Sequence, residues 1–348
     1  MDIIKIIFPT VLTFFIGLSI TPFFSRYFYK YKMWKKSSRS EMISSASFND
    51  IHNTEHEIST PRIGGMIVWV AVLFSVFVIY LLSVIFPSEL TLKLNFFSRS
   101  QTLVPLGAFF FAAFIGLIDD LIQIYGRGDE TTSDVAYRKV KIALVTLIGL
   151  VISLWFYYKL DFSSIHIPFG GSLELGIWFI PFFIVVMLAT FSTSVIDGLD
   201  GLAGGVLASV FAAFSVIAFF NDQIDISALS GAIAGAILAF LWFNIPPARF
   251  YMGETGMMAL TVVLAVIAFL TDSVLLLPII ALPLVATSAS VILQVHIFHK
   301  LLKRKLFRVT PLHHHFQALG WSREKVVMRY WIVSIISAIT GLILALVS

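Results

Sequence analysis

The chain has 348 residues, of which 58% are hydrophobic and only 13% are charged, and its mean hydropathy is +0.93. A water-soluble domain of this size cannot bury so much apolar surface, so the composition indicates a protein whose solvent is lipid. The net charge is +4, and the absence of cysteine excludes disulfides, thiolate metal sites and cysteine nucleophiles.

Ten segments approach the length of about 20 mainly apolar residues that a membrane-spanning helix needs. The first has neither a basic leader nor a small-residue cleavage site, so we interpret it as a retained helix rather than a signal peptide. The predicted fold class is therefore an all-α integral membrane protein, and residues 1–348 are expected to form a single polytopic domain. The predicted spans are residues 3–24, 63–86, 103–121, 140–158, 175–195, 202–220, 228–245, 256–270, 274–298 and 327–347.

The basic residues predict how these spans are oriented. Twenty of the 24 Lys and Arg fall in or beside the loops that follow the first, third, seventh and ninth spans. The positive-inside rule makes that side cytoplasmic, so ten spans place both termini on the extracytoplasmic side. For most of these lysines a topology signal is a sufficient explanation. The longest polar stretch, residues 26–62, is rich in Lys, Ser and Asn and predicts a partly disordered loop.

The first polar cluster is the carboxylate pair Asp119 and Asp120 at the cytoplasmic end of the third span. Adjacent like charges repel, and burial disfavours their ionised forms. A divalent cation relieves both problems, and magnesium is usually held by one or two carboxylates together with substrate phosphates. A solvated helix end is the alternative explanation.

The second cluster, residues 197–205, puts two carboxylates and four glycines into an otherwise apolar stretch. Asp197 and Asp200 share a face if the segment is helical. Two Asp-Gly steps predict a polar turn instead. Because a turn needs no second acidic residue, and carboxylates next to hydrocarbon are costly, we favour a functional site.

The third cluster covers residues 243–256. Its prolines end the seventh span. Glu254 then stands just before the eighth span, where a helix N-terminus favours negative charge. By itself this cluster therefore has a sufficient structural explanation.

The fourth cluster contains the consecutive residues His313, His314 and His315. Three consecutive side chains cannot all face one way on a helix, so we predict that they line a loop. One interpretation is an interfacial segment anchored by Trp321, and the other is proton handling or diphosphate binding. A zinc site is disfavoured because adjacent histidines lack the usual ligand spacing.

Together the clusters place carboxylates, histidines and bases at one membrane surface, which suits metal-assisted phosphoryl transfer. No Walker-type loop supports ATPase chemistry, and no GxSxG elbow accompanies a hydrolytic set. Nucleic-acid binding is not expected, because no binding module is recognisable. A transporter would be expected to gather polar groups near the bilayer midplane in paired halves, and neither feature is visible.

In this order the four clusters resemble the polyprenyl-phosphate N-acetylhexosamine-1-phosphate transferase superfamily. The resemblance runs from residues 61–65 to the last span, and its shared signatures are the pair at 119–120, the Asp-Gly-Leu-Asp-Gly-Leu-Ala run at 197–203 and the segment 244–256. Two branches compete. Residues 290–295, 310–316, 320–321 and 329–331 resemble the phospho-N-acetylmuramoyl-pentapeptide transferase branch. His56 and residues 61–65 are more similar to the transferases that begin O-antigen or teichoic-acid linkage units.

The resemblance implies a multi-pass enzyme of the bacterial inner membrane in which undecaprenyl phosphate attacks the sugar-linked phosphate of a UDP-sugar, UMP leaves and Mg²⁺ is required. The substrate is UDP-MurNAc-pentapeptide on the favoured branch and UDP-N-acetylglucosamine or a related UDP-N-acetylhexosamine on the other. A one-step attack and a covalent two-step route remain open, as do a homodimer and an inactive or transport relative. The resemblance assigns catalysis to Asp119, Asp120, Asp200, His313, His314 and His315, substrate binding to Thr60, Lys141, Asp197 and Asn244, and metal binding to Asp120, Ser194 and Glu254.

The chain departs from the superfamily pattern just before the second cluster. Phe191 and Ser194 stand where the family usually has asparagines, and Glu254 stands where it has aspartate. Glu254 keeps the charge but reaches one methylene further, Ser194 keeps an oxygen, and Phe191 keeps no polar group. An altered metal geometry follows as an expectation.

Overall fold

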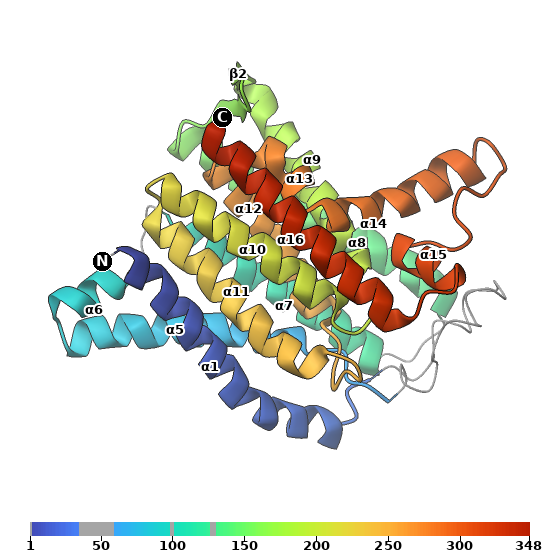
Figure 1. Cartoon of the computed structure of the whole chain (residues 1–348), viewed down its shortest axis with the longest axis horizontal. Helices are drawn as coiled ribbons and strands as arrows, with labels where there is room; N and C mark the ends of the chain where they lie inside the picture. Colours follow the sequence, from blue (N-terminus) through green and yellow to red (C-terminus); the bar gives the residue numbers. More distant parts are fainter. Residues whose placement is uncertain (1, 35–58, 98–100, 126–129) are drawn as a thin grey trace.

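Ten helices in the described part of the chain are long and apolar enough to cross a membrane, which confirms the predicted number of spans. The computed structural model describes residues 2–34, 59–97, 101–125 and 130–348. Figure 1 shows the spans as one bundle. They are built on α1 (Asp2–Lys30), α5 (Gly65–Ile85), α7 (Leu103–Tyr125), α8 (Glu130–Lys159), α9 (Phe179–Ser192), α10 (Leu202–Phe220), α11 (Ile224–Asn244), α12 (Gly253–Leu270), α14 (Leu282–Ile292) and α16 (Arg323–Val347).

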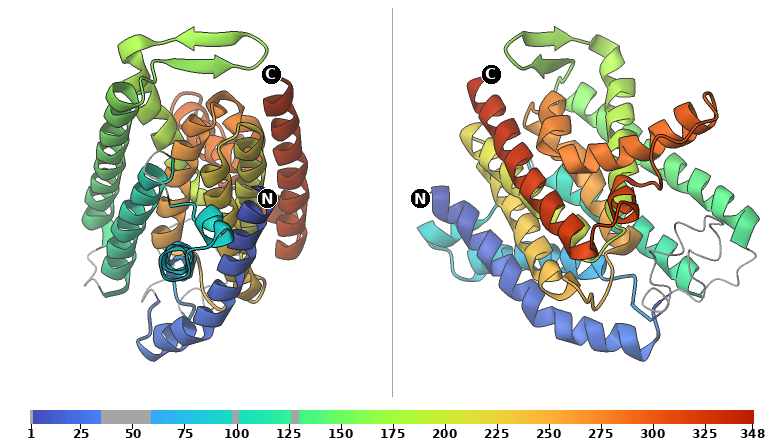
Figure 2. Two further views of the ribbon diagram at one scale, coloured as in Figure 1. Left: turned by 90° about the vertical axis from the view of Figure 1, so that its left-hand side faces the viewer. Right: turned by 45° about the vertical axis from the view of Figure 1, so that its right-hand side comes forward.

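Shorter elements connect these helices. An antiparallel hairpin, with Ile165 opposite Leu173, lies across one end of the bundle (Figure 2) and was missed by the all-α prediction. Its strands are too short and too polar to stand out against the neighbouring spans. The shorter elements are α6 (Glu89–Leu94), β1 (Ser164–Ile167), β2 (Gly171–Glu174), η1 (Gly176–Trp178), η2 (Thr193–Ile196), η3 (Val274–Leu276), α13 (Leu277–Ile280), η4 (Leu293–His299) and α15 (Leu312–Ala318).

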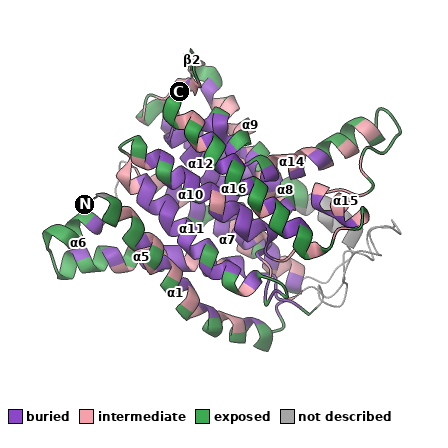
Figure 3. Ribbon diagram, viewed as in Figure 1, coloured by how far each residue is buried: buried purple, intermediate pink, exposed green. Residues whose placement is uncertain are grey.

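The centre of the bundle is α12, whose most apolar stretch is 94% buried, against 17% for α1 at the periphery. Figure 3 shows this gradient from the buried α10, α11 and α12 to the exposed outer helices. α12 packs against α7, α9 and α5, and α11 packs between α1 and α10. Glycine and alanine are frequent in α10 and α11, and small residues let transmembrane helices approach closely.

The ninth span is broken, so the prediction of one helix over residues 274–298 was wrong in this respect. The chain forms η3 and α13, bends at Ala281, and continues as α14 and η4. Pro278 and Pro283 each stand at the start of a new helix, where a missing N–H is tolerated. In Figure 1, α14 leads away from the bundle.

Two helices are longer than their apolar cores. α1 continues to Lys30, and α8 begins at Glu130 instead of residue 140. Polar residues extend these helices without adding hydrophobic length. The predicted loop over residues 26–62 is described only in part, because residues 35–58, which include His56, lie outside the described residues. At the described edges of that gap, the Arg62 N–H donates to the Met33 carbonyl over 3.0 Å.

Candidate active site

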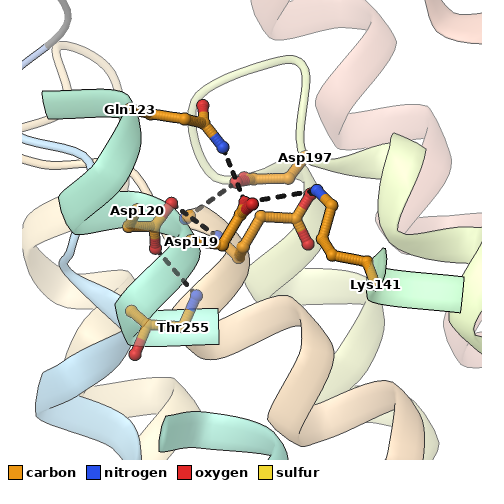
Figure 4. Close-up of polar contacts among 8 residues, drawn as sticks. Asp119, Asp120, Gln123, Lys141, Asp197 and Thr255 are labelled. Carbon is orange, nitrogen blue, oxygen red and sulfur yellow. Dashed lines mark hydrogen bonds and ion pairs between the residues drawn. The ribbon is translucent and has the colours of Figure 1, made fainter. Parts of the chain in front are cut away.

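The N-terminus of α12 is capped by carboxylates from two other elements (Figure 4). Asp120, near the end of α7, accepts hydrogen bonds from the backbone N–H groups of Glu254 (3.1 Å) and Thr255 (2.8 Å). Asp197 accepts from the N–H of Gly253 over 3.2 Å. These are the first three N–H groups of the helix, which have no partner within the helix and carry its positive dipole end. The sequence-predicted pair 119–120 and the 197–205 run therefore meet at residue 253.

Lys141 joins two further carboxylates beside this N-terminus. Its ammonium lies 3.2 Å from Oδ2 of Asp119 and 3.0 Å from Oε1 of Glu254. Asp119 Oδ2 also accepts from the side-chain amide of Gln123 over 2.6 Å (Figure 4). The Lys141 side chain is only 18% exposed, so water screens these charges weakly. Within the described residues, Oε2 of Glu254 is buried and has no hydrogen-bond partner.

Residues 197–201 form a turn between η2 and α10, so the helical alternative for Asp197 and Asp200 does not apply. Asp200 accepts from the N–H of Ala248 over 3.0 Å. Asn244 accepts from the N–H of Gly201 (3.0 Å) and donates to the carbonyl of Phe250 (2.8 Å). The side-chain amide of Asn244 thus connects the second and third clusters, which predicts a positioning role beside its expected part in substrate binding.

The segment before α5 lies along the third cluster. The Pro61 carbonyl accepts from the N–H of Tyr251 over 2.8 Å, and Gly64 donates back to the Tyr251 carbonyl over 2.9 Å. This pairing brings the buried residues Thr60 and Arg62 to the start of α12. The positive charge of Arg62 interacts with the Asp120 carboxylate.

The three histidines lie on the short helix α15, so the loop prediction was wrong. They do face different ways, as their spacing requires: His313 and His314 are buried, whereas His315 is half-buried. These different directions are compatible with a helix, because a helix does not require the three rings to share a face. His314 Nδ1 lies 2.7 Å from the side-chain oxygen of Gln317. A short turn of helix between Pro311 and Gly320 was too brief to show in the pattern.

His315 holds the chain that leads into α15. Its Nδ1 accepts from the backbone N–H of Arg308 over 3.1 Å, which requires a neutral Nδ1. Partial burial, and secondly the charge of Arg308, lower the pKa of the His315 imidazole. At a pH near the ordinary pKa of histidine, the neutral form of His315 is therefore favoured.

His313 packs against the turn that carries the two aspartates. A Cβ added at Gly198 would overlap with Nε2 of His313. This close approach brings the fourth cluster to the second, although about 115 residues separate them in the chain. All four clusters thus meet at the end of the bundle where α7 ends and α12 begins.

We expect Gly198→Ala to displace either the turn or the His313 ring, because the added methyl group has no space. A misplacement of about 1 Å in a catalytic group costs about 100-fold in rate, so turnover should fall by that order. Steady-state assays of the purified variants would measure it. Gly107→Ala, in α7, is the matched control, since its Cβ would meet nothing within 4 Å. Equal turnover by both variants would contradict the contact.

The departures from the superfamily pattern lie next to the turn. Ser194 is in η2, and its carbonyl accepts from the N–H of Asp197 over 3.2 Å. Phe191 is half-buried against the apolar core. The metal role of Ser194 stays a prediction. In the described ranges, no group of three or more His, Asp or Glu side chains stands close enough to enclose a metal ion.

Three contributing residues were missed by the sequence reasoning. Gln123 follows Asp119 by four positions on one helix face, a spacing that was visible in the sequence. Thr255 acts through its backbone N–H, which every non-proline residue has, so the sequence carried no signal. Trp331, in α16, belongs to residues 329–331, whose resemblance to the favoured branch was visible, but its donation to the Gly201 carbonyl over 3.0 Å depends on the tertiary fold and was not predicted.

The structure is thus a bundle of membrane-competent helices with a cluster of carboxylates where several helices end. Comparison with known proteins identifies the family that has this arrangement. Residues 102–272, which contain the first three clusters, match the family model described as glycosyl transferase family 4. The match covers the site from α7 to the end of α12.

Relatives extend the similarity over nearly the whole chain. Phospho-N-acetylmuramoyl-pentapeptide-transferase of Caldanaerobacter subterraneus subsp. tengcongensis is 34% identical over 336 residues, 96% of each chain. The protein of the same name from Chloroflexus aurantiacus is 32% identical over 305 residues, 84% of this chain and 78% of the relative. That from Listeria welshimeri is 37% identical over 229 residues, 65% of this chain and 69% of the relative. The chain belongs to the phospho-N-acetylmuramoyl-pentapeptide-transferase family within glycosyl transferase family 4.

Proposed function

We propose that this protein transfers phospho-N-acetylmuramoyl-pentapeptide from its UDP derivative to undecaprenyl phosphate, releasing UMP and forming the first lipid intermediate of peptidoglycan. A new bond forms between a lipid phosphate oxygen and the sugar-linked phosphorus, and the bond from that phosphorus to the UMP oxygen breaks. The observation that carries the proposal is the convergence of Asp120, Asp197 and the Lys141 ion pairs at the start of α12. Relatives of that name, aligned over 96% of the chain, support the substrate.

The donor set fits magnesium. Lys141 bridges the carboxylates of Asp119 and Glu254, and Oε2 of Glu254 is buried without a hydrogen-bond partner in the described chain. Asp120 and Asp197 bind the N–H groups at the start of the same helix. Magnesium commonly takes one or two carboxylates and completes its shell with phosphates and water, so a closed protein cage is not required. Glu254, with Asp120, would hold the ion, which would neutralise the substrate diphosphate.

The chain's own groups supply the remaining roles. Both hydrogen bonds to Asp119 end on Oδ2, so within the described chain Oδ1 is open to accept a proton from the lipid phosphate. Lys141 offsets the negative charge of Asp119 and Glu254 and orients both. Asp197 and Asp200 hold the turn that faces the nucleotide, and the α15 histidines border it through His313.

We place this end of the bundle at the cytoplasmic face of the bacterial inner membrane. The basic residues of α8, of the segment that follows η4 and of the start of α16 lie at the helix ends on the side of the site. A soluble UDP-sugar would reach the site from that side. Both termini would then lie on the other side. A homodimer stays a prediction.

Purified protein with undecaprenyl phosphate and Mg²⁺ would test the proposal in an assay of UMP release. We expect turnover with UDP-MurNAc-pentapeptide, little with UDP-N-acetylglucosamine, and none after EDTA. The reverse preference would favour the O-antigen or teichoic-acid branch. If neither sugar nucleotide turns over, the chain is a non-catalytic or transport relative. Turnover that survives EDTA would remove magnesium from the proposal.

A further inference from the structure

Gly201 ends the turn that carries Asp197 and Asp200, and both its backbone N–H and its carbonyl are hydrogen-bonded to side chains. Its φ of +76° lies in the left-handed region, which side chains other than glycine rarely adopt. The N–H donates to Asn244 over 3.0 Å, and the carbonyl accepts from Nε1 of Trp331 over 3.0 Å. One glycine is therefore fixed between α11 and α16.

Trp331 contacts the start of α10 with its ring as well as with its N–H. A Cβ added at Gly205 would overlap with the indole, and one added at Gly201 would lie 3.6 Å from the ring. The indole is half-buried and occupies the space left by these two glycines. α16 therefore packs closely against α10 beside the turn.

The other anchors of the turn come from the third cluster. Asp200 accepts from Ala248, and Asp197 accepts from Gly253, the first residue of α12. Displacing Gly201 would therefore move both carboxylates relative to the α12 N-terminus. The hydrogen bond from Trp331 of α16 to Gly201 thus helps to set the position of Asp197 and Asp200.

We propose that Trp331 is a positioning residue: its indole N–H fixes the left-handed Gly201 and thereby sets the affinity of the Asp197–Asp200 turn for the nucleotide part of the substrate. This inference rests on the proposed function only for the identity of the nucleotide. The rigidity of the turn is a property of the fold and is measurable without turnover.

The test compares Trp331→Phe with Ser334→Ala. Phe keeps a ring at the contact but lacks the N–H donor. Ser334, one turn further along α16, donates to the Val206 carbonyl over 3.3 Å, so its removal deletes a hydrogen bond between the same two helices away from the turn. Hydrogen exchange of the peptide containing residues 197–205 and the dissociation constant of UMP would be measured on both variants and the wild type.

We expect Trp331→Phe to speed exchange in this peptide, and to raise the UMP dissociation constant and the KM for the sugar nucleotide by about fivefold, as the loss of one hydrogen bond predicts. The KM for undecaprenyl phosphate should change less than about twofold. Ser334→Ala should leave UMP affinity unchanged. Unchanged exchange with Trp331→Phe, or equal effects of the two variants, would overturn the inference. If the wild type lacks turnover, the proposed function fails, while exchange and UMP binding still decide the role of Trp331.

Discussion

Lys141→Met is expected to lower turnover by about 100-fold, because a displacement of about 1 Å in catalytic carboxylates costs a rate factor of that order. The ammonium contacts Asp119 and Glu254 together, at 3.2 Å and 3.0 Å. Methionine keeps much of the side-chain stem but leaves these two carboxylates without their shared cation. Their repulsion would then displace Asp119 and Glu254 from their positions at the start of α12.

Lys5→Met provides a matched control for this variant. Lys5 pairs with Asp225 at the opposite end of the bundle over 2.6 Å, and its side chain is 20% exposed, close to the 18% of Lys141. Both variants should lose thermal stability, but only Lys141→Met should lose turnover. UMP release and thermal unfolding, measured on the same preparations, would separate the two effects. Similar turnover by both variants would remove Lys141 from the site.

Asp120→Asn and Asp119→Asn should both abolish detectable turnover yet differ in stability. Asp120 accepts two backbone N–H groups of α12, and asparagine would turn an NH₂ donor toward one of them. The backbone N–H left without an acceptor predicts a loss of about 1–3 kcal/mol. Asp119 accepts from Gln123 and Lys141 through one oxygen, which an asparagine carbonyl can replace.

Thermal unfolding of the two variants in the same detergent or lipid would measure this difference. A lower midpoint for Asp120→Asn than for Asp119→Asn is the expected order. If Asp120→Asn keeps near-normal turnover, Asp120 has neither a metal role nor a proton-transfer role. If the order of stability is reversed, the capping of α12 by Asp120 contributes less than the Lys141 network.

The sequence predicted the spans well because each one is set by its own composition. The ten apolar segments needed no knowledge of their neighbours, and their number was confirmed, although the ninth is broken. The break at Ala281 was missed although its prolines were visible, because the flanking residues stay apolar across the bend. Length alone does not separate one long helix from two short ones.

The candidate site was predicted from the cost of placing charge near lipid, and this argument identified the polar clusters but not their pairing. Lys141 and Glu254 are 113 positions apart, and Trp331 and Gly201 are 130 apart. No local pattern relates residues at such separations; only the packing of α8, α12, α10 and α16 brings them together. The helical form of residues 312–318 was missed for a different reason, since seven residues are too few to show a periodicity.

Bilayer thickness acts first on the helices that touch lipid. In this bundle those are outer helices such as α1 and α16, whose apolar stretches are 17% and 28% buried, and they can adjust to a thinner or thicker membrane by tilting. α12 is 94% buried and meets protein on nearly every side. Its N-terminus, with the carboxylates of Asp120 and Asp197, is therefore insulated from such adjustments. The same geometry can persist as the acyl chains around the protein lengthen or shorten.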